Sequence, residues 1–389
     1  MAFYRFAGGV WEVARAGRVG PVGSQRPGRA SIAPCHRNGF NITTGIGETK
    51  MSLGRFIVVA ALAFLTAGQA QAASESNNVD RAFVQAAQKR GAILWDTRDA
   101  AEYLKGHISG AVNVGDVAKT LRDPNREDFI PTSALEKILG AAGIDPAREI
   151  VVYGSTGNPF VAYAQYAIRY IGGRKAYVYH AGIEDWVAGG GPLSKTPPTP
   201  TPVKLSIKAD TAKFVTTEDV VKTVGRADVQ IVDARTPKEF AGEDIRAIRG
   251  GHIPGAVNIP YEQNWKDPET PQKLAQKQVK DRSGMDLKDR DALKTLYAKL
   301  DPKKETVVYC QSGVRASQTA AVLEDLGFEK VKVYESSWLG YAAKLSAPVE
   351  NETFFNVGAL NGRLAGMQRR IDQLEDDLAA AKKGAPTAK

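Results

Sequence analysis

The segment Gly251-His-Ile-Pro-Gly-Ala-Val-Asn-Ile259 has a near copy earlier in the chain, Gly106-His-Ile-Ser-Gly-Ala-Val-Asn-Val114. Each copy is preceded by an apolar, strand-like stretch that ends in Asp-x-Arg, at Asp96–Arg98 in the first half and at Asp233–Arg235 in the second. Each half continues with another apolar strand, a helix-like stretch and a further strand. Because short apolar strands alternate with helical stretches, the sequence predicts an α/β fold with two similar domains, each a mostly parallel sheet flanked by helices.

A proline-rich segment separates the two halves. Four prolines fall within residues 197–202, a composition that favours an extended, semi-rigid spacer. We therefore predict a first domain over residues 79–193, a linker over 194–203 and a second domain over 204–348.

The two halves differ at the end of their central strand. In the second half, Glu305-Thr-Val-Val-Tyr309 leads into Cys310-Gln-Ser-Gly-Val-Arg-Ala-Ser317, and a helix-like stretch then runs from Gln318 to Leu326. A thiol between a strand and a helix start lies where backbone N–H groups and the helix dipole favour an anion, which makes it a better nucleophile. The alternative is a small, buried and inert cysteine. The first half has Gly154 at the matching position, so thiol chemistry is excluded there.

The net charge of +9 is concentrated at the N-terminus. Eight lysines and arginines but only two acidic residues lie within residues 1–72. Because the rest of the chain is close to neutral, the sequence does not indicate a nucleic-acid partner. We expect residues 1–50 to be disordered or a mis-assigned leader.

A secretory signal peptide is predicted over residues 51–72. It has a short basic start at Met51, an apolar run over residues 56–67 and a small-x-small cleavage site, Ala70-Gln-Ala72. The apolar run is shorter than the ~20 residues that span a bilayer, and an uncleaved anchor is the alternative. Cleavage before Ala73 would give a periplasmic or secreted protein.

Cysteine and histidine usage limits the possible chemistry. The chain has two cysteines, and removal of the leader would remove Cys35 and leave Cys310 alone, with no internal disulfide. No Cys/His cluster has the spacing of a metal site, so we expect no metal and no other cofactor.

These motifs resemble those of the tandem-domain rhodanese family, the thiosulfate and 3-mercaptopyruvate sulfurtransferases. The resemblance covers nearly all of residues 79–348 and rests on the Asp-x-Arg strand ends, the repeated Gly-His-Ile-x-Gly-Ala-Val-Asn segment and Cys-x-x-Gly-Val at Cys310. It implies two rhodanese-like domains, the first inactive and the second catalytic. It also implies that Cys310 takes a sulfur atom from a small anionic donor, holds it as a persulfide and passes it to a thiophilic acceptor such as cyanide or a thiol.

Candidate binding residues follow from the loop and from the resemblance. The loop amides and a nearby cation would bind the anionic sulfur or its donor. We predict that the binding residues are Gln311, Ser312, Gly313, Val314, Arg315, Arg249 and Trp338. The alternatives are that Arg315 caps the loop at the surface, that Ser312 satisfies the loop backbone, and that Trp338 is a core residue.

The resemblance also implies that Asp233 and Arg235 position the catalytic loop. The same pair recurs as Asp96 and Arg98 in the inactive half, so a purely structural role is equally open. His107 and His252 occur in both copies of the repeat and are interpreted as fold residues.

The loop sequence leaves the sulfur donor open. Four residues lie between Cys310 and Arg315, one fewer than in related phosphate-binding loops, which disfavours a phosphatase or an arsenate reductase. The loop matches neither the thiosulfate type, Cys-Arg-Lys-Gly-Val-Thr, nor the mercaptopyruvate type, Cys-Gly-Ser-Gly-Val-Thr. Glu239 stands where mercaptopyruvate enzymes tend to have an arginine, for which Arg246 and Arg249 are possible substitutes. We favour thiosulfate, because an exported enzyme meets inorganic sulfur anions; the alternatives are 3-mercaptopyruvate and a non-turnover persulfide carrier that serves a partner protein.

The C-terminal region has a heptad pattern. Apolar residues alternate in steps of three and four at Val357, Leu360, Leu364, Met367, Ile371, Leu374 and Leu378. We predict a helix over residues 354–383 that either self-associates or docks a partner as a coiled coil, or else packs back on the protein. The last six residues, from Gly384, are expected to be disordered.

Overall fold

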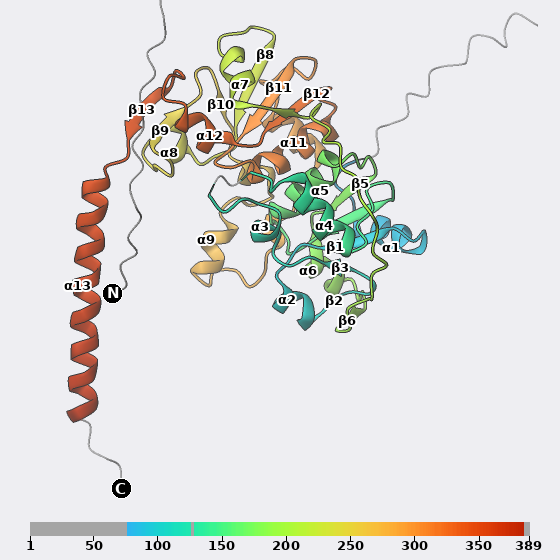
Figure 1. Cartoon of the computed structure of the whole chain (residues 1–389), viewed down its shortest axis with the longest axis horizontal. Coiled ribbons are helices and arrows are strands. Elements are labelled where there is room, and N and C mark those ends of the chain that lie inside the picture. Colours follow the sequence, from blue (N-terminus) through green and yellow to red (C-terminus); the bar gives the residue numbers. More distant parts are fainter. Residues whose placement is uncertain (1–75, 126–127, 385–389) are drawn as a thin grey trace, which may run out of the picture. The chain divides into compact units, whose positions relative to one another are not determined.

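The structure, a computed structural model, describes residues 76–125 and 128–384 (Figure 1). The predicted leader (1–50), the predicted signal peptide (51–72) and the end of the tail after Gly384 lie outside the described residues. Among the described helices, none is both long and apolar enough to cross a membrane.

The first half of the described chain forms a four-stranded parallel sheet with the strand order β3-β1-β4-β5. Every residue of β1, β4 and β5 is buried, as expected for strands with helices on both faces. The elements of this half are α1 (Arg81–Lys89), β1 (Ile93–Asp96), α2 (Ala100–Lys105), β2 (His107–Ile108), β3 (Val112–Asn113), α3 (Val117–Thr120), α4 (Thr132–Ala141), β4 (Ile150–Tyr153), α5 (Phe160–Tyr170), β5 (Ala176–Tyr179), α6 (Gly182–Ala188) and β6 (Leu193–Ser194).

The second half forms a five-stranded parallel sheet with the order β10-β8-β11-β12-β7. β11 lies at its centre, and Tyr309 at the end of β11 is in register with Asp233 at the end of β8. The elements are β7 (Phe214–Val215), α7 (Thr217–Thr223), β8 (Val229–Asp233), α8 (Pro237–Phe240), β9 (Arg249–His252), β10 (Val257–Asn258), η1 (Tyr261–Asn264), α9 (Thr270–Ala275), η2 (Ser283–Met285), α10 (Arg290–Leu296), β11 (Glu305–Tyr309), α11 (Val314–Leu326), β12 (Lys330–Tyr334) and α12 (Ser337–Ala343).

The predicted α/β architecture, with two similar parallel sheets flanked by helices, is confirmed. One boundary is wrong: the helix after Cys310 begins at Val314 rather than Gln318. Gly313 adopts a left-handed conformation before the helix, and both the N–H and the hydroxyl of Ser317 donate to its carbonyl, at 3.0 and 2.9 Å. The helix therefore starts one turn earlier, and it ends at the left-handed Gly327, where a stop was expected.

The two sheets are joined by packing between α5 and α11. Val314 of α11 belongs to the apolar cluster of the first sheet, and Tyr166 of α5 belongs to that of the second. The proline-rich connection lies against α4, where the Val203 N–H donates to the Gly140 carbonyl and the Ile207 N–H to the Glu136 carboxylate. The two halves therefore share part of their apolar cores.

The C-terminal region begins with a strand that lies outside the five-stranded sheet. β13 (Glu350–Phe354) pairs antiparallel with β9, and α13 (Val357–Gly384) follows it. The predicted C-terminal helix is therefore present.

Candidate active site

Cys310 is the first residue after β11, and its side chain is buried, with 1 % exposed. It belongs to an apolar cluster that includes Val232 and Ala234, and it opens the short turn that ends at Gly313. Gly313 has a φ of +81°, and a Cβ there would lie 2.8 Å from the Glu335 carbonyl oxygen, so a glycine is required on both counts. The turn is thus fixed tightly beside the thiol.

The turn and the first residues of α11 present backbone N–H groups that are free to bind an anion. Within the described residues, no protein acceptor takes up the N–H groups of Gln311, Ser312, Val314, Arg315 and Ala316. A helix start leaves such groups open, and the helix dipole gives them a partial positive charge. These five N–H groups next to Cys310 in the chain are therefore available to an anion.

Two other amides of the turn are already engaged by Ser337. Its Oγ accepts the N–H of Cys310 at 3.1 Å and the N–H of Gly313 at 3.0 Å, and its O–H donates to the Tyr334 carbonyl at 2.6 Å. Ser337 was not predicted from the sequence, since it lies 27 residues after Cys310 in the chain. The hydroxyl fixes both ends of the turn.

Arg315 is held by Glu239 of α8. The guanidinium forms two parallel hydrogen bonds to the carboxylate, at 2.7 and 2.8 Å. Burial alone would raise the pKa of Glu239, but the hydrogen bonds and charge of Arg315 lower that pKa to about 2. Burial alone would lower the pKa of Arg315. The hydrogen bonds to Glu239 and the negative charges of Glu239 and Cys310 raise that pKa instead. Arg315 is therefore a largely buried, permanent cation paired with Glu239, not a surface cap.

The Asp233–Arg235 pair is buried and self-contained. Arg235 donates to both carboxylate oxygens of Asp233 and to the Gly251 carbonyl, at 2.8 Å. The first half repeats this arrangement, with Arg98 bound to Asp96 and to the Gly106 carbonyl. The repetition favours the structural interpretation of the pair.

Trp338 links that pair to the turn. The Arg235 guanidinium lies 4.5 Å from the centre of the Trp338 ring, and the Trp338 backbone N–H donates to the Cys310 carbonyl at 3.0 Å. The ring is buried, and its Nε1 donates to the Arg249 carbonyl. Trp338 is thus placed as a core residue under the turn, rather than as a wall that meets the donor.

Arg249 is not placed to bind the donor. Its guanidinium is buried and donates to the carbonyls of Tyr341, Ala342 and Lys344 at the end of α12, and to Glu352 at 2.7 Å. The expectation that it binds substrate is therefore corrected: a positive charge at a helix C-terminus satisfies the last carbonyls there. Arg246, whose side chain is 54 % exposed, lies closer to the site, since its carbonyl accepts from Gln311 Nε2 and its guanidinium reaches Glu239.

Comparison with known proteins decides the family. The sequence profile described as "Rhodanese-like domain" matches residues 80–189 and again residues 216–344. The chain belongs to the rhodanese family of sulfurtransferases. It is 31 % identical over 271 residues to a thiosulfate sulfurtransferase of Corynebacterium glutamicum, an alignment that covers 66 % of this chain and 84 % of that protein. It is 32 % identical over 261 residues to a thiosulfate sulfurtransferase of Azotobacter vinelandii, covering 66 % and 90 %.

A solved structure shares the fold of this rhodanese. The crystal structure of an anaerobic ergothioneine biosynthesis enzyme from Chlorobium limicola, in complex with trimethyl histidine, matches with a TM-score of 0.59 over 70 % of each chain. The two sequences are 20 % identical, so the likeness establishes the fold alone.

The first rhodanese-like domain has no room for a larger side chain at Gly154, the residue that corresponds to Cys310. The Ile183 N–H donates to the Gly154 carbonyl, as the Trp338 N–H does to that of Cys310. A Cβ at Gly154 would lie 2.7 Å from Thr97 Oγ1, and Gly182 stands where the second domain has Ser337. Restoring a cysteine at residue 154 would therefore require the surrounding residues to move.

The first domain nevertheless contacts the catalytic turn. Arg122 donates to the Ser312 carbonyl at 3.0 Å, and the Phe129 N–H donates to the Glu335 carboxylate at 2.9 Å. Burial raises the pKa of Glu335 to about 7. These contacts between domains were not visible in the sequence, which gives no distance between residues almost 200 positions apart.

Two titratable residues of η1 have raised pKa values. Burial raises the pKa of Tyr261, and the negative charges of Glu262 and Cys310 raise that pKa further. Burial raises the pKa of Glu262, and among the described residues its Oε2 has no hydrogen-bond partner. Both follow the Gly-His-Ile segment of the second domain, and no motif marked them.

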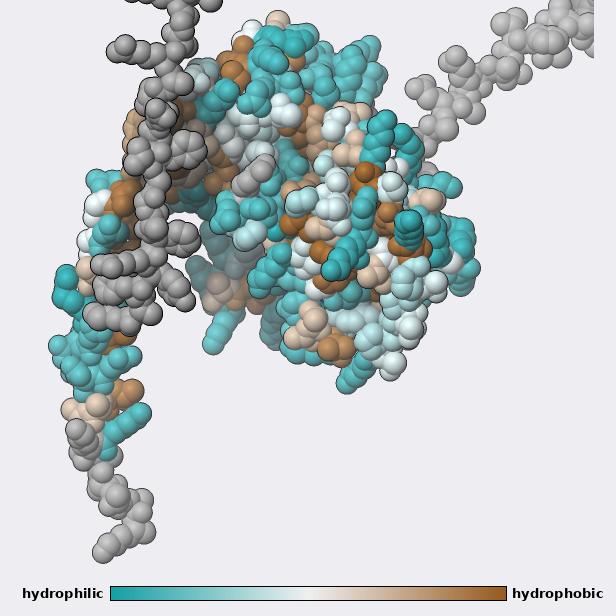
Figure 2. All heavy atoms as spheres, in the orientation of Figure 1, coloured by the Kyte–Doolittle hydropathy of each residue, from teal (hydrophilic) through white to brown (hydrophobic). Residues whose placement is uncertain are grey.

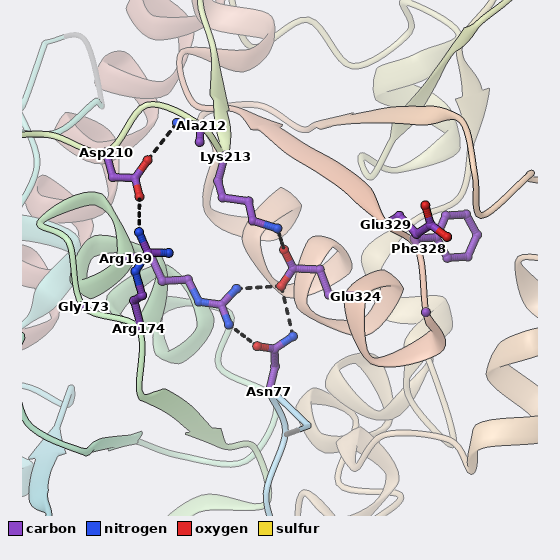
Figure 3. Close-up of a pocket in the computed structure, with 11 residues that line it drawn as sticks. Asn77, Arg169, Gly173, Arg174, Asp210, Ala212, Lys213, Glu324, Phe328 and Glu329 are labelled. Atoms are coloured by element: carbon purple, nitrogen blue, oxygen red, sulfur yellow. Dashed lines mark hydrogen bonds and ion pairs between the residues drawn. The ribbon is translucent and has the colours of Figure 1, made fainter. Parts of the chain in front are cut away.

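The pocket between the domains is a different feature. It measures about 490 Å³, and Figure 3 shows the side chains of Arg169, Lys213 and Glu324 turned toward one another. Glu324 of α11 binds Arg169 at 2.6 Å and Lys213 at 2.8 Å, and Asn77 donates to the same carboxylate. Cys310 does not line this pocket. The ion pairs of Glu324 in the pocket hold the two domains together.

Proposed function

We propose that this rhodanese transfers a sulfane sulfur from thiosulfate to a thiophilic acceptor through a persulfide on Cys310. In the first step, the Cys310 thiolate attacks the outer sulfur of thiosulfate; a new S–S bond forms, the old one breaks, and sulfite leaves with the bonding electrons. In the second step, cyanide or a thiolate attacks the terminal sulfur, and Cys310 leaves as thiolate.

The cluster of free amides beside Cys310 carries the proposal. A persulfide places its negative terminal sulfur about 2 Å beyond Sγ, the length of an S–S bond. The N–H groups of the turn and of the start of α11 would replace water around that charge without having to reorganise. A buried thiol with no such donors would be inert.

The cations near the turn fit an anionic donor. Glu239 offsets the charge of Arg315, so the exposed Arg246 supplies the remaining positive charge at the edge of the site. A small inorganic anion is held by charge and N–H donors alone, whereas a mercaptopyruvate carboxylate would favour a dedicated arginine at residue 239. The names of the two relatives, both thiosulfate sulfurtransferases, support the same donor.

Steady-state rates of thiocyanate formation test this proposal. With cyanide as the acceptor, we expect thiosulfate to give a higher kcat/KM than 3-mercaptopyruvate, and Cys310→Ser to abolish turnover with either donor. A higher kcat/KM with 3-mercaptopyruvate would overturn the donor assignment. Full activity of Cys310→Ser would overturn the mechanism.

We further propose that the protein is exported. The signal peptide predicted over residues 51–72 supports this. N-terminal sequencing of the protein from a periplasmic extract should give Ala73 as the first residue, whereas a chain that keeps its leader in the cytoplasmic fraction would contradict export.

A further inference from the structure

The helix α13 exposes a continuous apolar stripe. Seven large hydrophobic residues follow one another along it, each between 38 % and 62 % exposed: Val357, Leu360, Leu364, Met367, Ile371, Leu374 and Leu378. In Figure 2, brown side chains interrupt the teal ones along this helix. A stripe of this length on a soluble helix indicates a surface that another chain covers.

Contacts with the two domains do not stabilise α13. Its residues 357–382 are exposed, apart from the half-buried Gly366, so it gains nothing from packing on the domains. Gly358, Gly362 and Gly366 each cost about 1 kcal/mol relative to alanine in a helix. All three lie outside the apolar stripe. An isolated helix of this composition is marginal in water, and a partner helix would supply the missing packing.

We propose that α13 forms a parallel, two-stranded coiled coil with α13 of a second copy of this chain. In heptad positions, Val357, Leu364, Ile371 and Leu378 occupy a, and Leu360, Met367 and Leu374 occupy d. Two of the four a positions carry β-branched residues, Val357 and Ile371, and two of the three d positions carry leucine, a combination that favours two strands.

The flanking charges select the parallel arrangement. Position g of one helix then faces position e of the next heptad in its partner. Arg370 faces Glu375 of the second copy, and Asp377 faces Lys382, so both pairs are attractive. In an antiparallel pair with the same apolar layers, Arg370 would face Arg370 of the second copy. The charges at e and g therefore match a second copy of α13 in the parallel direction.

The dimer would join two catalytic domains. β13, which precedes the helix, pairs with β9 in a separate two-stranded sheet of the second domain, and Glu352 of β13 forms a 2.7 Å ion pair with the buried Arg249. This connection holds the base of α13 to the domain that contains Cys310.

Cysteine cross-linking in the full chain tests the arrangement. In a parallel coil, residue 374 faces its own copy, so Leu374→Cys should give a disulfide-linked dimer on a non-reducing gel. The matched control Arg369→Cys, on the outer face of the same helix, should not. Wild-type protein should sediment at twice the mass of one chain. A wild-type monomer at micromolar concentration would overturn the proposal.

Two further variants separate direction from association. Mixing Leu364→Cys with Leu374→Cys would cross-link an antiparallel dimer, and cross-linking in that mixture without cross-linking of Leu374→Cys alone would overturn the parallel assignment. Arg370→Glu should weaken the dimer on the order of tenfold, and the exchange Arg370→Glu with Glu375→Arg should restore it. Failure of the exchange to restore the dimer would contradict the proposed pairing.

Discussion

The Oγ of Ser337 lies 3.1 Å from the backbone nitrogen of Cys310 and accepts its hydrogen bond. The same oxygen accepts from Gly313, although Ser337 has a φ of +47°, a left-handed conformation that is rare for serine. Backbone strain of this kind costs about 1–3 kcal/mol and persists where the surroundings enforce it. The Ser337 hydroxyl therefore holds the turn between Cys310 and Gly313 in place, while the backbone of Ser337 itself is strained.

Two substitutions at Ser337 separate positioning from stability. Ser337→Gly removes the hydroxyl and relieves the left-handed strain, as Gly182 does in the first domain. Ser337→Ala removes the hydroxyl but keeps the strain, so its free energy of unfolding should fall by about 2 kcal/mol. Both variants should lose on the order of tenfold in kcat/KM, a loss of about 1.4 kcal/mol in transition-state stabilisation. Wild-type kcat/KM in Ser337→Gly would exclude a positioning role.

The pair formed by Glu239 and Arg315 predicts a pH dependence of stability. The pKa of Glu239 is about 2 in the folded protein, against an ordinary value of 4.5. Because the folded pKa is lowered, its contribution is fully present above about pH 5 and is lost as the pH falls toward about 2, with a magnitude on the order of 3 kcal/mol. Urea unfolding should show the gap between wild type and Glu239→Gln shrinking over that range. A gap that stays constant would contradict the pairing.

Arg246 and Arg249 offer a matched comparison. Arg249 is fully engaged inside the protein, so Arg249→Met should lower the free energy of unfolding by about 3 kcal/mol and leave the KM for thiosulfate unchanged. Arg246 is half exposed at the edge of the site, so Arg246→Met should raise that KM several-fold at nearly constant stability. A raised KM in Arg249→Met with an unchanged KM in Arg246→Met would instead show that Arg249 binds the donor.

The sequence predicted what depends on local pattern. Repeated apolar strands and the Gly-His-Ile segments predicted two similar domains, and the exchange of Cys310 for Gly154 located the candidate nucleophile in the second. The start of α11 was missed because a left-handed Gly313 begins the helix before its apolar periodicity does.

The rest of the site depends on contacts that sequence spacing does not reveal. Ser337 accepts from Cys310, which lies 27 residues away in the chain. Glu239 accepts from Arg315 across 76 residues, and Arg122 donates to Ser312 across 190. The sequence predicts Arg249 as a binding residue because it could replace the arginine that mercaptopyruvate enzymes tend to have at the position of Glu239. Its burial under α12 and its carbonyl partners became visible only in three dimensions.

Intact-protein mass spectrometry tests the central role of Cys310 most directly. After incubation with thiosulfate and removal of excess donor, we predict that the protein gains the mass of one sulfur atom and loses it on addition of cyanide, with thiocyanate released. Cys310→Ser should gain nothing under the same conditions. A wild-type protein that gains no sulfur, or a Cys310→Ser protein that gains as much as wild type, would contradict the account.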